Sequence, residues 1–239
     1  SITRRIAATT VLLTMSIVAV LGVLSYQNMR SYIRETIDAT LQDDADHIAL
    51  HVERLLHTIN ENAESIAGNY SIANALQDAE GRSSYLVPFF LSYQLPEQVS
   101  FTIALCDPKG EFIAGNAPRS SHASLRDKAL LEQVARRGLP YAAMLPDKRQ
   151  AGLRIAHPIR PSASMKPQGM LVIDILLDDV FNRAWREEAE QRSMNVSFQC
   201  CDSLIWERTT FTAKNAVTYS RPLHHLHPLL GGLSLAITV

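Results

Sequence analysis

Residues 6–29 read IAATTVLLTMSIVAVLGVLSYQNM, and no charged side chain interrupts them. As a helix this stretch would be about 36 Å long, enough to cross a bilayer core of roughly 30 Å with some tilt. Its apolar core, Ile6 to Leu24, exceeds the roughly 7–15 residues usual in a signal peptide, and no small-residue cleavage site follows it. The stretch therefore predicts an uncleaved transmembrane anchor, residues 1–29.

The charges beside this anchor predict its orientation. Arg4 and Arg5 precede it, so the positive-inside rule places the N-terminus in the cytoplasm, although Arg30 and Arg34 follow on the other side. We therefore expect an inner-membrane protein with the residues after about 30 in the periplasm. The chain begins at Ser1 rather than Met and ends in an apolar run, so we also expect it to be part of a longer protein.

The anchor is predicted to continue as a helix beyond the membrane. Apolar residues recur every three, four or seven positions from Ile33 to Ile66, which is the spacing of one helical face. Gly68-Asn69 is a suitable stop, so one helix of about 60 residues is expected over Ile6–Ala67. The distal part of its apolar face comprises Ile48, Val52, Leu55 and Ile59. This face can serve as domain core, as a dimer seam, or as both.

Beyond the long helix, the pattern alternates between helical and strand periodicity. Helices are expected at Ser71–Ala79, Ser83–Gln94, Ser124–Arg137 and Asp178–Arg192. A first group of strands is expected at Phe101–Cys106, Glu111–Gly115, Tyr141–Leu145, Leu153–Ile159 and Gly169–Leu177. A second group is expected at Val196–Cys201, Leu204–Glu207, Ala216–Pro222 and Leu233–Val239. This order predicts an α+β fold with two unequal antiparallel sheet modules.

Composition and motifs exclude several classes of protein. Hydrophobic residues make up 46% and charged residues 20% of the chain, and its net charge of -1 offers nothing to a nucleic acid. No Ser-His-Asp order, phosphate loop or metalloprotease motif is present. We therefore expect no catalytic residues, no cofactor and no nucleic-acid partner in this stretch of protein.

Two groups of histidines are candidate metal ligands. His47 and His51 are four apart on the long helix, but a solvated helix face accounts for them better, because Ile48 stands where a zinc protease motif has Glu. His224, His225 and His227 lie between two prolines, where an exposed turn is the preferred interpretation. We therefore predict no metal site.

The three cysteines are too few for a disulfide scaffold. Cys200 and Cys201 could bridge each other, or one of them could pair with Cys106. Because Cys106 ends an apolar strand, a buried thiol is the preferred interpretation for it.

Several segments, in this order, resemble the double-CACHE (tandem PAS-like) sensor domains of bacterial transmembrane receptors. They are the anchor running into a long helix, the turn LCDPKGEFIA at residues 105–114, the helix over Leu125–Gly138 and the strand GMLVIDI at 169–175. The helical segment from Ile72 to Phe90 is also similar to such sensors. The resemblance covers about residues 1–180.

The resemblance implies both architecture and activity. Residues 30–180 would form the long helix and a membrane-distal PAS-like module that binds a small molecule, and residues 181–239 a smaller membrane-proximal module. A second span would lead to a cytoplasmic histidine kinase or a diguanylate cyclase/phosphodiesterase. The alternative is a single-pass periplasmic scaffold that docks a protein partner. The gene beyond Val239 discriminates them, because a second span and a catalytic module support the receptor whereas a stop codon supports the scaffold.

In a PAS-like module, the pocket lies between the sheet and the elements that cover it. The candidate ligand-binding residues are Lys128 on the covering helix and Tyr141, Arg154, His157 and Asp174 on the strands. Relatives that bind amino acids or small carboxylates often carry an arginine and an aromatic pair near Lys128. Here the residues are Lys128, Leu130 and Leu131, so the resemblance does not imply an amino-acid ligand.

Asp174 matches an acidic position that relatives use to bind ligand ammonium groups. It interrupts the apolar run Met170–Leu177, so its carboxylate is expected to be partly buried and to need a partner. That partner is either the ligand or an internal cation, Lys128 or Arg154. Because a long amphipathic helix favours twofold pairing, we also expect a homodimer.

Overall fold

The computed structural model describes residues 2–77, 82–119, 125–145, 152–160, 166–186, 195–200, 203–208, 218–222 and 233–238. The chain divides into two compact units, Ser1–Asp44 and Ala45–Val239. The helices are α1 (Ile2–Ala67), α2 (Tyr70–Ala75), α3 (Arg82–Ser92), α4 (Lys128–Leu130) and α5 (Leu177–Arg186), together with the single turn η1 (Pro96–Gln98) and the π-helical η3 (Leu131–Arg136). The strands are β1 (Phe101–Cys106), β2 (Phe112–Gly115), β3 (Tyr141–Leu145), β4 (Gly152–Ile159), β5 (Gly169–Leu176), β6 (Asn195–Cys200), β7 (Ser203–Arg208), β8 (Thr218–Pro222) and β9 (Leu233–Thr238).

The first unit consists of the N-terminal part of α1. From Val11 onward, α1 contains a stretch that is long and apolar enough to cross a membrane, with a mean hydropathy of 1.6. Large side chains such as Val11, Leu12 and Met15 are 59–70% exposed, so the described residues do not bury them. The predicted long apolar helix is therefore confirmed, and its length and composition suit a membrane anchor.

The distal part of α1 belongs to the second unit and contributes to its core. Ile48, Val52, Leu55 and Ile59 are 0–4% exposed within a single chain. This burial decides between the two uses expected for the apolar face of α1, domain core and dimer seam. It is domain core, and the idea that it also serves as a dimer seam is wrong, because side chains already buried in one chain offer no surface to a second.

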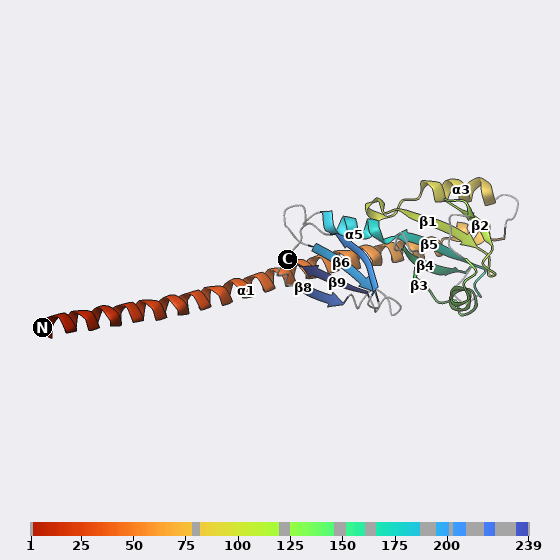
Figure 1. Ribbon diagram of the computed structural model, residues 1–239. Coiled ribbons are helices and arrows are strands. Elements are labelled where there is room, and N and C mark those ends of the chain that lie inside the picture. Colours follow the sequence, from red (N-terminus) through yellow and green to blue (C-terminus); the bar gives the residue numbers. More distant parts are fainter. Residues whose placement is uncertain are drawn as a thin grey trace. The chain divides into compact units, whose positions relative to one another are not determined.

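The strands form two antiparallel sheets, which Figure 1 shows with their helices. The five-stranded sheet has the order β2-β1-β5-β4-β3, and the four-stranded sheet has the order β7-β6-β9-β8. The predicted α+β class with two unequal antiparallel sheets is confirmed. The bounds of β1 and β3 are those expected from the sequence, and the other strands differ by one or two residues at their ends.

The two faces of the five-stranded sheet pack against different elements. Side chains alternate between faces along a strand, so even-numbered residues of β4 and β5 share one face and odd-numbered residues share the other. The even-numbered face packs against the segment Leu125–Gly138, which contains α4 and η3 and is called the covering segment below. The odd-numbered face contacts α1, where Asn60 forms a hydrogen bond to His157.

Candidate functional site

The covering-segment face consists of rows of side chains that run across the strands. Cross-strand pairing places Ala104, Val172, Ala156 and Tyr141 in one row. These residues form one cluster with Leu130 and Val134 of the covering segment. The adjacent row is polar, because Thr102, Asp174 and Arg154 stand side by side on β1, β5 and β4. The polar row is thus flanked by an apolar core.

Arg154 and Asp174 form a bidentate ion pair within this row. Arg154 Nε and Nη2 donate to the two carboxylate oxygens of Asp174, each over 2.7 Å. The side chains are only 4% and 10% exposed. Of the internal cations considered from the sequence, Arg154 is therefore the partner of Asp174. A pair held by two short, charge-assisted hydrogen bonds is fixed in position before any ligand arrives.

Tyr141 lies on the same face but bonds to a residue that the sequence did not single out. Its hydroxyl donates to Asp127 Oδ2 over 3.2 Å, while Asp127 Oδ1 accepts from the N–H of Ala129 and caps α4. Burial raises the pKa of Tyr141, and the charge of Asp127 together with this hydrogen bond raises it further, whereas Arg154 opposes the shift. Asp127 thus connects the covering segment to the edge strand β3. The helix predicted over Ser124–Arg137 has its N-terminal cap at Asp127.

Lys128 and His157 do not join this group. Lys128 is exposed at the start of α4, and its side chain has no hydrogen bond or ion pair within the described part of the chain. His157 lies on the opposite face of the sheet, where its Nε2 is 3.0 Å from Oδ1 of Asn60. Burial lowers the pKa of His157, and the charge of Glu64 partly offsets this effect. The structure therefore brings three of the five predicted residues to one face: Tyr141, Arg154 and Asp174.

Cys106 stands at the end of β1 on the same face. It is a free thiol, fully buried among apolar side chains. Burial raises its pKa to about 12, although the charge of Arg154 acts in the opposite direction. The buried-thiol interpretation is confirmed, and such a thiol stays protonated and unreactive at neutral pH.

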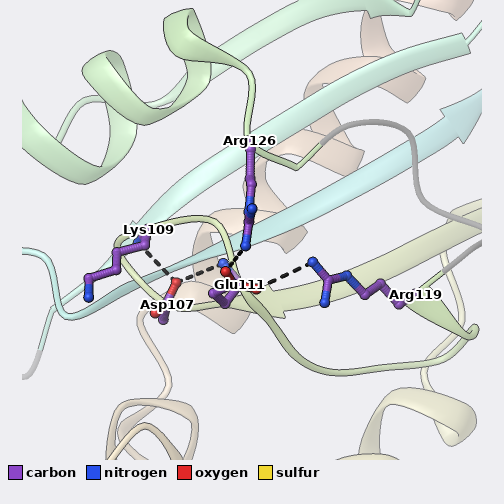
Figure 2. Close-up of polar contacts among 5 residues, drawn as sticks. All are labelled: Asp107, Lys109, Glu111, Arg119 and Arg126. Carbon is purple, nitrogen blue, oxygen red and sulfur yellow. Dashed lines mark hydrogen bonds and ion pairs between the residues drawn. The ribbon is translucent and has the colours of Figure 1, made fainter.

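Figure 2 shows how the start of the covering segment is held. Asp107 Oδ1 accepts hydrogen bonds from the N–H groups of Lys109 and Glu111, which closes the turn between β1 and β2. The Glu111 carboxylate pairs with Arg126 of the covering segment and with Arg119, the latter over 3.3 Å. These side chains are 41–61% exposed, so each ion pair contributes only modestly to stability. Their main effect is to position the covering segment against the turn.

Two glycines allow close backbone approaches at the ends of the covering segment. Gly110 has a φ of +80°, and a Cβ there would lie 2.6 Å from the carbonyl oxygen of Leu125. Gly138 has a φ of +68°, and Arg160 Nη2 donates to its carbonyl oxygen. Between them η3 is π-helical, with Arg137 N–H bonded to Glu132 O over 3.1 Å, a feature that often marks functional sites. The segment is thus fixed at both ends and irregular in the middle.

No candidate metal centre is found in the part of the chain that the structure describes, where no three metal-ligating side chains come together. His51 faces Glu97, with 3.6 Å between Nε2 and Oε1. His224, His225, His227 and Cys201 lie outside the described residues, as does the side chain of Cys200.

Comparison with solved structures finds several sensor and ligand-binding domains with this arrangement. The sensor domain of the Vibrio cholerae histidine kinase DctB matches with a TM-score of 0.60 and 14% identity over 85% of this chain and 97% of that one. The ligand-binding domain of the Pseudomonas fluorescens chemoreceptor CtaA, in complex with L-isoleucine, matches with a TM-score of 0.59 and 13% identity over 88% and 95%. The Vibrio cholerae LuxQ periplasmic domain matches with a TM-score of 0.55 and 13% identity over 83% and 97%. The chain has the double-CACHE sensor fold.

The match to the double-CACHE fold covers 83–88% of this chain, whereas the resemblance in sequence covers about residues 1–180. No protein-family model matches the chain, and no curated protein matches it in sequence. At 13–14% identity, the likeness is one of architecture. The chemistry of any site must therefore come from this chain's own residues.

Proposed function

We propose that this chain is the extracytoplasmic sensing region of a bacterial transmembrane receptor, and that it binds a small molecule between the five-stranded sheet and the covering segment. The observation that carries this proposal is the Arg154–Asp174 pair, which sits in a largely apolar face. A few fixed polar groups in an apolar setting are typical of small-molecule sites. The sensor fold supports the same function.

In this proposal, a charged group of the ligand replaces one partner of the pair. A cation would compete for Asp174 and an anion for Arg154, while the Tyr141 hydroxyl supplies a neighbouring hydrogen-bonding group. CtaA was crystallised with L-isoleucine. Relatives that bind amino acids often carry an arginine and an aromatic pair near this position. In this chain the covering segment carries the buried, apolar Leu130 and the exposed Lys128 there. We therefore propose a ligand other than an α-amino acid.

The test is a thermal-shift screen of the full chain in detergent micelles, using small amines, carboxylates and L-amino acids, followed by calorimetry. Asp174→Asn should weaken binding of a cationic hit by about 30-fold or more, since a buried charge pair is worth roughly 2–5 kcal/mol. His157→Gln, on the opposite face, is the matched control and should bind normally. Unchanged affinity in Asp174→Asn would remove this site from consideration, and tight L-isoleucine binding would contradict the proposed ligand class.

The proposal also includes an arrangement in the membrane. Residues 1–29 would be the anchor, residues 30–180 the long helix with the membrane-distal module, and residues 181–239 the membrane-proximal module. If the anchor is uncleaved, the protein should stay in the membrane fraction after high-salt and carbonate washes. A soluble form beginning near Ser25 or Tyr26 would show cleavage instead.

The receptor is proposed to act as a homodimer with a cytoplasmic output. Ile33 and Ile37 of α1 are 46% and 41% exposed, so they remain available to a second copy, and cysteines at these positions should cross-link in membranes. The likeness to DctB supports a histidine-kinase output, while none of the structures compared adds support for a diguanylate cyclase or phosphodiesterase. The gene beyond Val239 decides both the output and the alternative of a periplasmic scaffold.

A further inference from the structure

Helix α5 directly continues the strand that carries Asp174. β5 ends at Leu176 and α5 begins at Leu177, with no loop between them. Four apolar residues of α5 recur at helical spacing on one face: Leu177, Val180, Phe181 and Ala184, all 0–5% exposed. The junction contains neither a loop nor a glycine, so strand and helix are joined directly.

Three hydrogen bonds hold α5 and its junction against the chain that leads into β1. Leu176 N–H donates to Ser100 O over 3.1 Å, and Ser100 N–H donates to Asp179 Oδ2 over 3.1 Å. Arg183 Nη2 donates to Gln98 O over 3.2 Å. Strand β1 lies next to β5 in the sheet. Helix α5 is therefore attached to the five-stranded sheet at two adjacent strands: it continues β5 directly, and its hydrogen bonds reach the chain that leads into β1.

The chain at this attachment is strained. Glu97 and Gln98 have φ values of 53° and 55°, in the left-handed region that residues other than glycine rarely adopt. Two consecutive residues of this kind persist only where surrounding contacts hold them, and here Arg183 binds the carbonyl of the second. The position of α5 and the conformation of this turn therefore depend on each other.

On its other side, α5 packs into the four-stranded sheet. The ring of Phe181 stacks on that of Phe198 from β6, with centroids 3.8 Å apart and planes inclined by 7°. Trp206 from β7 closes the group, with its centroid 5.8 Å from that of Phe181 and 5.7 Å from that of Phe198. Phe181 and Phe198 are almost completely buried, so neither ring can move without the other.

We propose that α5 is the element that couples the two sheets, and that Phe181 is its coupling side chain. A change at the Arg154–Asp174 pair would displace β5, β5 would displace α5, and the stacked rings would carry that displacement into β6 and β7. Closely packed groups of this kind shift between discrete arrangements rather than deforming gradually. The use of this coupling in sensing rests on the proposed function, but the coupling itself is independent of any ligand.

The experiment is a urea titration of the full chain in detergent micelles, followed by hydrogen-exchange mass spectrometry. Peptides covering β5 and β6 report the two sheets separately in the same sample. In the wild type both should become exposed at one urea midpoint. Phe181→Ala should lower the β6 midpoint by about 1 M or more relative to that of β5, because it removes the ring that joins them.

Phe90→Ala is the matched control, since Phe90 is an equally buried phenylalanine in α3, away from the stack. It should lower both midpoints together. Separate midpoints in the wild type, or equal shifts of both sheets in Phe181→Ala, would overturn the proposal. Should Phe181→Ala fail to fold, Phe181→Leu keeps an apolar side chain without the stacked ring and must show the same separation in smaller measure. Because no ligand is used, this result is independent of the ligand-binding test.

Discussion

The two faces of the five-stranded sheet are built from the same strands but carry different side chains. The face toward α1 is apolar at Ile155, Leu171 and Ile173, with His157 as its polar member bonded to Asn60. The face toward the covering segment carries Thr102, Asp174 and Arg154 in a row. One face therefore serves to hold the long helix, while the other retains a charge pair that packing alone does not require.

The largest expected effect is on the charge pair. Arg154→Met should destabilise the protein by about 3–5 kcal/mol, because it leaves the Asp174 carboxylate buried without its partner. The double variant Arg154→Met/Asp174→Leu should recover most of this loss, since no charge remains buried. Urea unfolding of both variants measures the difference. If the single and double variants are equally unstable, the pair is not the distinguishing feature of this face.

On the α1 face, a cavity should be costly without affecting ligand binding. Ile173→Ala should cost about 2–5 kcal/mol, since Ile173 is fully buried and the surrounding core can only partly collapse. Any small molecule bound by the wild type should bind the folded variant with unchanged affinity in calorimetry. A specific loss of affinity in Ile173→Ala would show that the two faces are not functionally separate.

A smaller effect is expected at the edge of the covering-segment face. Tyr141→Phe removes only the hydroxyl that donates to Asp127, so it should cost about 0.5–1.5 kcal/mol. The matched variant Asp127→Ala should cost at least as much, because it also removes the cap of α4. Thermal unfolding compares the two. A neutral Tyr141→Phe would show that this contact does not hold the covering segment.

The smallest effect is a dependence on pH from the α1 face. Burial lowers the folded-state pKa of His157 below its ordinary value of 6.5. As the pH falls below about 6.5, the unfolded chain therefore takes up a proton at His157 that the folded chain does not, and stability decreases until the lower folded pKa is reached. His157→Gln should remove this part of the decrease, and Glu64→Gln should deepen it because Glu64 raises the pKa. Unfolding midpoints at pH 7 and pH 5 measure both.

Features of the fold and of the candidate site were predictable from the sequence where the side-chain pattern marks them, and not where backbone hydrogen bonds alone define them. Strands β1 and β3 are predicted with correct ends, because each is a short, largely apolar run that stops at turn residues such as Asp107-Pro108 and Pro146. Asp174 was found because a carboxylate within an apolar strand requires a partner. The π-helical turns of η3 were missed, since they are defined by backbone hydrogen bonds that leave no trace in the side-chain pattern.

The prediction that His157 shares a face with Arg154 is wrong, and the strand pattern could have corrected it. Arg154 and His157 are three residues apart on one strand, and side chains on a strand alternate, so they must face opposite sides. Lys128 offered no comparable rule, because the direction of a side chain at a helix start depends on where the helix begins. The sequence suggested Ser124, and the structure places the cap at Asp127.

The carboxylate of Glu111 has a consequence for how this protein tolerates change. It is shared between Arg119 and Arg126, so loss of either arginine leaves the other in place, whereas loss of the glutamate releases both. Because each of these exposed pairs contributes modestly to stability, substitution of one arginine should be tolerated more readily than substitution of the glutamate. Among natural variants of this chain, positions 119 and 126 should therefore vary more than position 111.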